Sequence, residues 1–468
     1  MSLLDTSDPR PVHFIGIAGA GMSALAELFV RRGVMVTGCD ASPEGSVDLA
    51  RLGINVVSGH DPAHVEAARA VVVSSALPRT HPELERARAL GLPVIRRAEA
   101  LGAAVNHGTL VAVAGTHGKT TTTVMTTEAL VAAGLAPTGV VGGRVGAWEG
   151  NLRAGDGSVF VVEADEYDRS FLALTPTVAV VTNVEADHLD IYADLDDIRR
   201  TFARFLEPAR AVVLCADDAG ASSLELPRGA EVLRYGIGSP DARVIGVPTA
   251  RGDGGTDVRV VFDGEHLGDV ALRVPGNHNV RNALAALASG LALGATVDAM
   301  RPGLEAFGGV ERRFQRLGEA GGVSVVDDYA HHPTEIRATL AAARVAFPGR
   351  RIVAAFQPHL YSRTRDFAGD FGEALAAADA VFLTEIYPAR EQPVAGVDAG
   401  LVAAPLVRAG GVLAWRGERG ALAEALARAV SDGDVVLTIG AGDVTRTGPE
   451  LLARLRERGS GSTPAGSA

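Results

Sequence analysis

The chain has 468 residues, of which 47% are hydrophobic and 21% are charged, and its formal net charge is −12. The length predicts roughly three domains of about 150 residues each, and the acidic balance argues against a protein that binds nucleic acid or anionic membranes. The two cysteines, Cys39 and Cys215, give no disulfide framework and no zinc motif. This cysteine usage predicts a reducing cytoplasm. No apolar run predicts a membrane span, and the first ten residues do not resemble a signal peptide.

Segments rich in valine and isoleucine alternate with segments rich in alanine, leucine and arginine along almost the whole chain. This alternation is typical of α/β proteins with mostly parallel sheets. Breaks in the pattern predict three domains, over residues 11–105, 106–308 and 309–456. The last residues, 457–468, are rich in glycine and serine, and we expect them to form a disordered tail.

The first domain opens with a glycine-rich turn between a predicted strand over residues 12–17 and a predicted helix. Gly19 and Gly21 begin the pattern G-x-G-x-x-A, and Asp40 follows about 20 residues later at the end of the next strand. This fingerprint predicts a helix N-terminus that binds a diphosphate, with an acid near a ribose. NAD and a UDP-sugar both carry these groups, and a third interpretation is that the glycines serve only close packing between strand and helix.

The central domain contains the one lysine of the chain, Lys119, in the loop G-T-H-G-K-T-T at residues 115–121. A predicted strand precedes the loop and a predicted helix follows it, so backbone N–H groups and the positive end of the helix converge there. The loop is shorter than the common G-x-x-x-x-G-K-[ST] form, because Val113 stands where that form has its first glycine. A chain that otherwise uses arginine and histidine retains a compact ammonium group here, which indicates a nucleotide phosphate. We predict that the loop binds ATP or another nucleoside triphosphate, with the Thr120 hydroxyl directed at magnesium.

Other predicted strands of the central domain also end in polar residues. Glu163 ends the strand over residues 159–163, where a carboxylate can hold magnesium directly or through water. His188 follows the strand over residues 178–181, and it is a candidate metal ligand, base or substrate contact. The asparagines and the histidine of P-G-N-H-N, residues 275–279, begin a helix, where they either cap the helix or contact an adenine edge.

Polar clusters follow four strands of the third domain, at residues 327–335, 357–365, 385–391 and 440–443. The carboxyl ends of parallel strands meet at one edge of a sheet, and α/β proteins form their sites at that edge. The four clusters together therefore predict a binding site in the third domain.

The order of G-T-H-G-K-T-T, E-A-D-E, E-A-D-H-L-D, P-G-N-H-N, D-D-Y-A-H-H-P-T-E and Y-S-R-T-R resembles the ATP-dependent Mur ligases of peptidoglycan synthesis. The resemblance extends over residues 11–450. It implies a Rossmann-like N-terminal domain that binds a UDP-sugar, a central P-loop ATPase-like domain, and a Rossmann-like C-terminal α/β domain that binds an amino acid. Some relatives carry a carbamylated lysine in the central domain, and the absence of a lysine for this role fits the alanine-adding branch.

The resemblance also implies a reaction. ATP phosphorylates the carboxylate of UDP-N-acetylmuramate, and the amine of L-alanine then attacks the acyl phosphate. Lys119, Glu163 and His188 are the expected catalytic residues, and Thr120, Glu163 and His188 are the expected ligands of two Mg²⁺ ions. The expected amino-acid contacts are Tyr329, His331 and Arg363. The expected ATP contacts are Gly115, Thr116, His117, Gly118, Lys119, Thr120, Thr121, His278, Asn279 and Asn282, and the expected UDP-sugar contacts are Gly19, Gly21, Met22, Ser23, Asp40, Ser74 and Ser75.

Three other interpretations of the sequence compete with this one. A recycling ligase that attaches a whole murein tripeptide would need a roomier third domain. A dinucleotide-dependent oxidoreductase would use Gly19, Gly21 and Asp40, but it would leave Lys119 without a role. A regulatory or motor ATPase would leave the polar clusters of the third domain without a role. The oligomeric state stays open between monomer and dimer.

Overall fold

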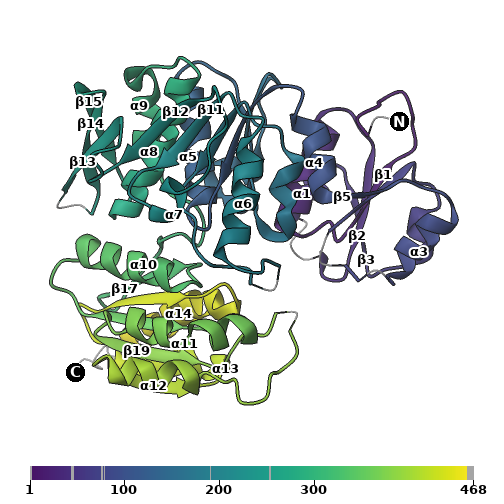
Figure 1. The fold of residues 1–468 in the computed structure, drawn as a ribbon. Coiled ribbons are helices and arrows are strands. Elements are labelled where there is room, and N and C mark those ends of the chain that lie inside the picture. The colour runs from purple at the N-terminus through teal and green to yellow at the C-terminus, as the bar shows by residue number, and fades with distance from the viewer. Residues whose placement is uncertain are drawn as a thin grey trace, which may run out of the picture. The chain divides into compact units, whose positions relative to one another are not determined.

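The computed structural model describes residues 3–43, 47–74, 77–78, 80–189, 191–251, 254–389 and 391–460 (Figure 1). The chain forms two compact units. The predicted domains over 11–105 and 106–308 lie mainly in the first unit, and the domain over 309–456 lies in the second. No helix in these described ranges has the length and apolar character needed to cross a bilayer. The first unit consists of Met1–Thr249, Asp257–Leu272 and Asn279–Phe307, and the second of Ala250–Thr256, Arg273–His278 and Gly308–Ala468.

The N-terminal domain has a parallel five-stranded sheet in the order β3-β2-β1-β4-β5. This order reverses direction beside β1 (Val12–Ile15), and ligands of such sheets bind at the carboxyl end of that strand. Because side chains alternate along β1, Phe14 joins the core under α1 (Ala20–Arg31), whereas Ile15 joins the core under α3 (Pro82–Ala89). The other elements are β2 (Val36–Asp40), α2 (Val47–Arg51), β3 (Asn55–Ser58), η2 (Pro62–Val65), β4 (Ala70–Val73), β5 (Val94–Arg96) and α4 (Arg97–Val105).

The central domain has a ten-stranded sheet in the order β15-β14-β13-β12-β11-β10-β6-β9-β7-β8. Strand β6 (Thr109–Ala114) is buried from its second residue onward and leads through the glycine loop into α5 (Lys119–Ala132). Helix α1 of the N-terminal domain lies against β7 and β8 of this sheet. The other elements are β7 (Thr138–Val145), η3 (Gly146–Trp148), β8 (Gly150–Arg153), β9 (Val159–Glu163), η4 (Tyr167–Ala173), β10 (Val178–Val181), α6 (Leu195–Leu206), β11 (Ala211–Cys215), α7 (Ala219–Ser222), β12 (Glu231–Gly236), β13 (Val244–Ala250), β14 (Thr256–Phe262), β15 (Glu265–Leu272), α8 (Asn277–Ala292) and α9 (Val297–Ala306).

The second unit has a six-stranded sheet in the order β16-β17-β21-β18-β19-β20. Strands β17, β21, β18 and β19 are parallel neighbours, so the four polar clusters that follow them share one sheet edge, as the sequence predicts. Separate apolar cores cover the two faces of the sheet. The elements are β16 (Gln315–Ala320), β17 (Val323–Asp328), α10 (Pro333–Ala346), β18 (Ile352–Phe356), α11 (Tyr361–Leu375), β19 (Ala380–Thr384), α12 (Gly400–Arg408), β20 (Leu413–Gly417), α13 (Arg419–Ala429), β21 (Val435–Ile439), η5 (Asp443–Arg446) and α14 (Thr447–Ser460).

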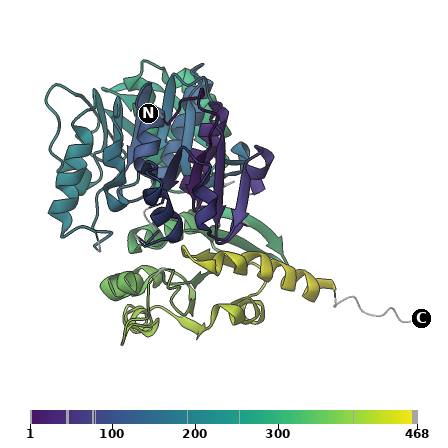
Figure 2. The same cartoon turned by 90° about the vertical axis from the view of Figure 1, so that its right-hand side faces the viewer.

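The last helix corrects one expectation from the sequence. Helix α14 continues to Ser460, whereas the sequence analysis placed the start of a disordered tail at residue 457 (Figure 2, yellow helix). Leu451, Leu452 and Leu455 of this helix are buried in the core of the second unit, and their burial stabilises the helix. Residues 461–468 of the expected tail lie outside the described residues.

Candidate functional site

The loop between β6 and α5 depends on glycine at two positions. Gly115 has φ 132° and Gly118 has φ 80°, and L-residues with side chains rarely adopt such conformations. A Cβ atom at Gly115 would lie 2.1 Å from Oγ1 of Thr182. Helix α5 begins at Lys119 without a side-chain cap, so its first-turn N–H groups face the loop.

The loop is held in place by the residues that follow β10. The Thr182 hydroxyl donates to the carbonyl oxygen of His117 at 2.6 Å, and the His117 N–H donates to Oδ1 of Asn183 at 2.7 Å. The Thr116 hydroxyl accepts a hydrogen bond from the Glu185 N–H at 2.9 Å. These bonds join two neighbouring parallel strands at their carboxyl ends, where they fix the backbone of the loop.

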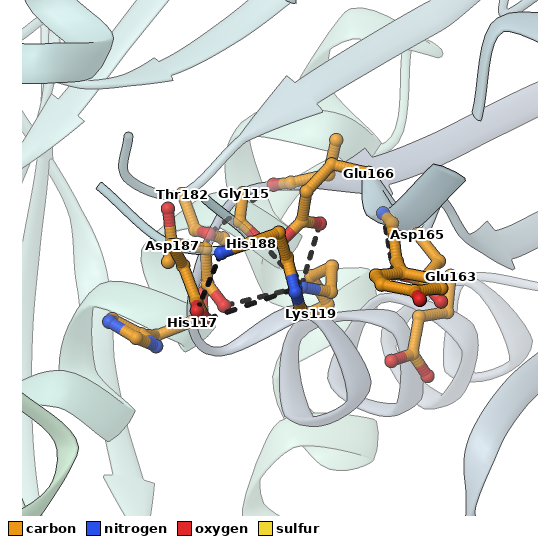
Figure 3. Close-up of polar contacts among 12 residues, drawn as sticks. Gly115, His117, Lys119, Glu163, Asp165, Glu166, Thr182, Asp187 and His188 are labelled. Carbon is orange, nitrogen blue, oxygen red and sulfur yellow. Dashed lines mark hydrogen bonds and ion pairs between the residues drawn. The ribbon is translucent and has the colours of Figure 1, made fainter. Parts of the chain in front are cut away.

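Lys119 lies at the centre of the loop and is largely buried (Figure 3). Its Nζ donates to the carbonyl oxygen of Gly115 at 2.7 Å and lies 2.8 Å from Oε2 of Glu166. Burial by itself would lower the pKa of Lys119, but the carboxylates of Glu166 and Asp165 outweigh burial and raise the pKa above its ordinary value. The ammonium group therefore stays charged at neutral pH.

Thr120 and Glu163 form a pair beside this lysine. The Thr120 hydroxyl donates to Oε1 of Glu163 at 2.9 Å, while Oε2 of Glu163 accepts from the Gly142 N–H at 2.6 Å. Hydroxyl and carboxylate oxygens are the donors that Mg²⁺ prefers. The residues present therefore fit a magnesium ion.

His188 lies on the other side of Lys119 and has a left-handed backbone with φ 53°. Its Nε2 is 3.8 Å from Oε1 of Glu166 and 3.8 Å from Oδ2 of Asp187. The sequence analysis grouped His188 with Glu163, whereas the structure brings it next to Glu166. Glu166 was not among the predicted site residues, although it is the second acid of E-A-D-E, and that repeated acid was the available signal.

Helix α8 supplies the residues expected to contact adenine. Oδ1 of Asn282 accepts from the Thr122 hydroxyl at 3.1 Å, which ties α8 to the first turns of α5. Asn279 lies one turn earlier, with its Oδ1 3.4 Å from Nδ2 of Asn282. His278 stands in the first turn of α8. Asn282 therefore contacts α5 directly, Asn279 contacts Asn282, and the role of the three residues at adenine stays a prediction.

The glycine-rich turn of the N-terminal domain is organised by Asp40. Its carboxylate accepts from the N–H groups of Ala18 and Ser42, at 3.0 and 2.9 Å. Gly19 precedes the first turn of α1, which contains the other expected contacts of this turn, and Ser74 directly follows β4. Ser75 lies outside the described residues. Five of the residues expected to contact the UDP-sugar therefore lie at this turn. They are Gly19, Gly21, Met22, Ser23 and Asp40.

The second unit brings the three expected amino-acid contacts into one cluster. Nδ1 of His331 lies 3.0 Å from the carbonyl oxygen of Tyr329, and the ring of His331 lies 6.1 Å from that of His359. Nδ1 of His359 lies 3.5 Å from Nη1 of Arg363, and Arg363 is largely buried. The Arg312 guanidinium covers the Tyr329 ring at 4.7 Å. Arg312 and His359 are additional members of this cluster that the sequence analysis did not assign.

Three family models match consecutive parts of the chain. They describe the Mur ligase family catalytic domain at residues 11–109, the Mur ligase middle domain at 113–290, and the Mur ligase glutamate ligase domain at 312–442. This chain belongs to the Mur ligase family. It is an ATP-dependent ligase that forms amide bonds, and the oxidoreductase and motor-ATPase interpretations are excluded.

Similar proteins cover almost the whole chain. A UDP-N-acetylmuramate–L-alanine ligase of Saccharopolyspora erythraea is 46% identical over 97% of this chain and 94% of its own length. The enzyme of the same name from Kineococcus radiotolerans is 48% identical, over 96% of this chain and 96% of its own length. Among solved structures, the UDP-N-acetylmuramate–alanine ligase of Thermotoga maritima has a TM-score of 0.82 at 30% identity, covering 96% of this chain and all of its own. A murein peptide ligase of Psychrobacter arcticus has a TM-score of 0.70 at 25% identity, and the match covers 96% of this chain and 99% of that structure's chain.

Two glycines at opposite ends of α5 allow a matched test of the loop. Gly118 has φ 80° and Gly134 has φ 83°, so alanine brings a similar backbone strain of ~1–2 kcal/mol at both. At Gly118 the new Cβ would lie 2.8 Å from Oδ1 of Asn282, whereas at Gly134 it would have no atom within 4 Å. We expect Gly118→Ala to weaken ATP binding at least about tenfold, or ~1.4 kcal/mol, and Gly134→Ala to leave it unchanged, measured by calorimetric titration. Equal weakening of ATP binding in both variants would contradict the prediction that the loop binds ATP.

Proposed function

We propose that this chain joins L-alanine to the carboxylate of UDP-N-acetylmuramate, through an acyl phosphate, in the cytoplasmic synthesis of peptidoglycan precursors. The observation that carries the proposal is the near-complete match to relatives with this name at 42–48% identity. The geometry of the phosphate loop supports it, because the loop presents one buried ammonium group and a hydroxyl–carboxylate pair. We further propose that the domains over 11–105, 106–308 and 309–456 bind the UDP-sugar, ATP and the amino acid, respectively.

Lys119 is proposed to act by charge and position. The reaction brings together two anions, the muramyl carboxylate and the γ-phosphate of ATP, and their repulsion raises the barrier. The ammonium group, held by the Gly115 carbonyl and by Glu166, would stabilise the negative charge that develops on the leaving ADP. Nζ donates to Gly115, Thr116 and Glu166, so one of these bonds would be exchanged for a phosphate oxygen when ATP binds.

Two donor sets are proposed to hold Mg²⁺. Thr120 and Glu163 form one, and His188 with Glu166 forms a second on the other side of Lys119, while Glu163 stays a candidate for both ions. Bound magnesium supplies positive charge that neutralises the phosphate oxygens. Glu166 also holds Lys119 in its orientation.

The cluster of the second unit is proposed to bind L-alanine. Arg363 is the candidate for its carboxylate, because a guanidinium offers two parallel donors to a carboxylate. Tyr329 and His331 are the candidates for contacts near the amine. A free α-amino group has a pKa of ~7.7–8.0, so a nearby carboxylate or imidazole suffices to deprotonate it. His331 is within 3.3 Å of Oε2 of Glu335, which orients its ring.

Phosphate release from ATP tests the proposed reaction. We expect release with Mg²⁺, UDP-N-acetylmuramate and L-alanine together, and only background release when either the UDP-sugar or L-alanine is omitted. Replacing L-alanine by the murein tripeptide distinguishes the recycling ligase, for which release would require the tripeptide. Release that does not depend on the UDP-sugar would contradict the proposed reaction as a whole.

Replacing the loop lysine separates catalysis from UDP-sugar binding. Lys119→Ala removes the ammonium group from the loop, and we expect turnover to fall by at least about 10²-fold. Binding of UDP-N-acetylmuramate, followed by calorimetry, should stay close to that of the unchanged chain. If both properties fall together, the assignment of the UDP-sugar to the N-terminal domain is wrong.

Two threonines of α5 test the first magnesium set. Thr120 donates to Glu163, whereas Thr126 donates to the backbone carbonyl of Thr122 in its own helix. Valine keeps the shape of threonine and removes only the hydroxyl. We expect Thr120→Val to raise the Mg²⁺ concentration needed for half-maximal phosphate release, and Thr126→Val to leave it unchanged. An unchanged magnesium dependence in Thr120→Val would remove Thr120 from the metal site.

A further inference from the structure

A second cluster of metal-binding side chains lies in the N-terminal domain. Strands β1 and β2, η2, α3 and the residues just before η2 and α3 contribute to it, on the face of the sheet that α3 covers. The surrounding side chains are apolar and include Ile15, Val65 and Leu84. The members of the cluster are His13, Cys39, His60, His64, His81 and Glu83.

Glu83 is the centre of this cluster and is fully buried. The Cys39 thiol lies 3.1 Å from its Oε1, and Nδ1 of His64 lies 2.7 Å from the same oxygen. Nδ1 of His60 lies 3.2 Å from Oε2. Within the described chain the polar contacts of this carboxylate come from these side chains, from His81 at 3.8 Å and from the Asp61 N–H, and none comes from an arginine. A buried carboxylate without a permanent positive partner is costly.

Two ring nitrogens in the cluster lack a hydrogen bond among the described residues. His13 is 2% exposed, and its Nδ1 lies 3.0 Å from the Thr37 hydroxyl, but its Nε2 has no partner. Nδ1 of His81 is also buried without a hydrogen bond. Buried polar atoms almost always have a partner, so the unpartnered Nε2 of His13 indicates a ligand. One donor atom from each of His13, Cys39, His64 and Glu83 lies within 4.8 Å of the other three.

We propose that His13, Cys39, His64 and Glu83 bind one Zn²⁺ ion. One sulfur, two imidazole nitrogens and one carboxylate oxygen are the donor types of tetrahedral zinc sites. Binding releases the Cys39 thiol proton to solvent, and the thiolate, carboxylate and metal then compensate one another's charge. His60 lies 3.3 Å from Sγ of Cys39 and, with His81, surrounds the ligands as an outer partner.

The position of the site gives it a structural role. The carbonyl oxygen of Cys39 accepts from the N–H groups of Gly16 and Ile17, at 2.8 and 3.1 Å. The next residue, Asp40, accepts from Ala18. An ion bound to Cys39 would therefore fix the end of β2, and the end of β2 accepts the hydrogen bonds that hold the glycine-rich turn. The ion is expected to stabilise this domain and the turn without taking part in phosphate transfer.

Cobalt provides a direct test of the site. The full-length chain is freed of metal by a chelator and titrated with Co²⁺ in excess Mg²⁺, which occupies sites made of oxygen donors. We expect one Co²⁺ per chain, with the thiolate-to-cobalt absorption band and the visible bands of tetrahedral cobalt, and we expect Zn²⁺ to displace it. Cys39→Ser should lose the thiolate band. Cys215→Ser, which alters the other buried free cysteine, is the matched control and should keep it.

A second variant and a second measurement keep the test independent of folding. His64 is partly exposed, so His64→Asn should fold, as checked by circular dichroism, and should bind Zn²⁺ at least about tenfold more weakly. Zn²⁺ should raise the Tm of the unchanged chain and of Cys215→Ser, but not that of Cys39→Ser. The absence of a thiolate band in the unchanged chain, or equal Zn²⁺ affinity in His64→Asn, would overturn the proposal.

Discussion

The central domain is arranged around one buried ammonium group. Lys119 is surrounded by backbone carbonyl oxygens of its own loop and by Glu166, and this environment keeps it charged although it has little contact with water. A buried charge is stable only when its partners are fixed. The left-handed glycines, the bonds from Thr182 and Asn183 to His117, and the parallel pairing of β6 with β10 supply that rigidity.

The same constraint links the loop to more distant parts of the first unit. Asn282 reaches the Thr122 hydroxyl from α8, and Glu163 reaches Thr120 from the end of β9. Each contact comes from a different secondary-structure element but ends on the first turns of α5. The first turns of α5 are therefore held by groups from α8 and from the end of β9.

Sequence reasoning succeeded where chemistry and local structure coincide. The strand–loop–helix around Lys119, the acid that ends β9 and the polar clusters after β17, β18, β19 and β21 were predictable, because each motif directly follows a strand. The boundary of α14 was not, because burial of its leucines in a distant core extends the helix into a sequence rich in polar residues and glycine. The neighbour of His188 was also missed, because the fold brings Glu166 from a separate segment to within 3.8 Å of its Nε2.

The sequence alone determined the family, the strand–loop–helix around Lys119 and the order of the domains, since these depend on residues that are adjacent in the chain. Only the tertiary structure revealed Glu166 between Lys119 and His188, and the cluster of Cys39 and Glu83 with four histidines. The members of that cluster lie between residues 13 and 83 without a recognisable ligand spacing, and the sequence analysis found no zinc motif. They meet because β1 and β2 pair in parallel and α3 packs on the same face, and this is a property of the fold and not of any one segment.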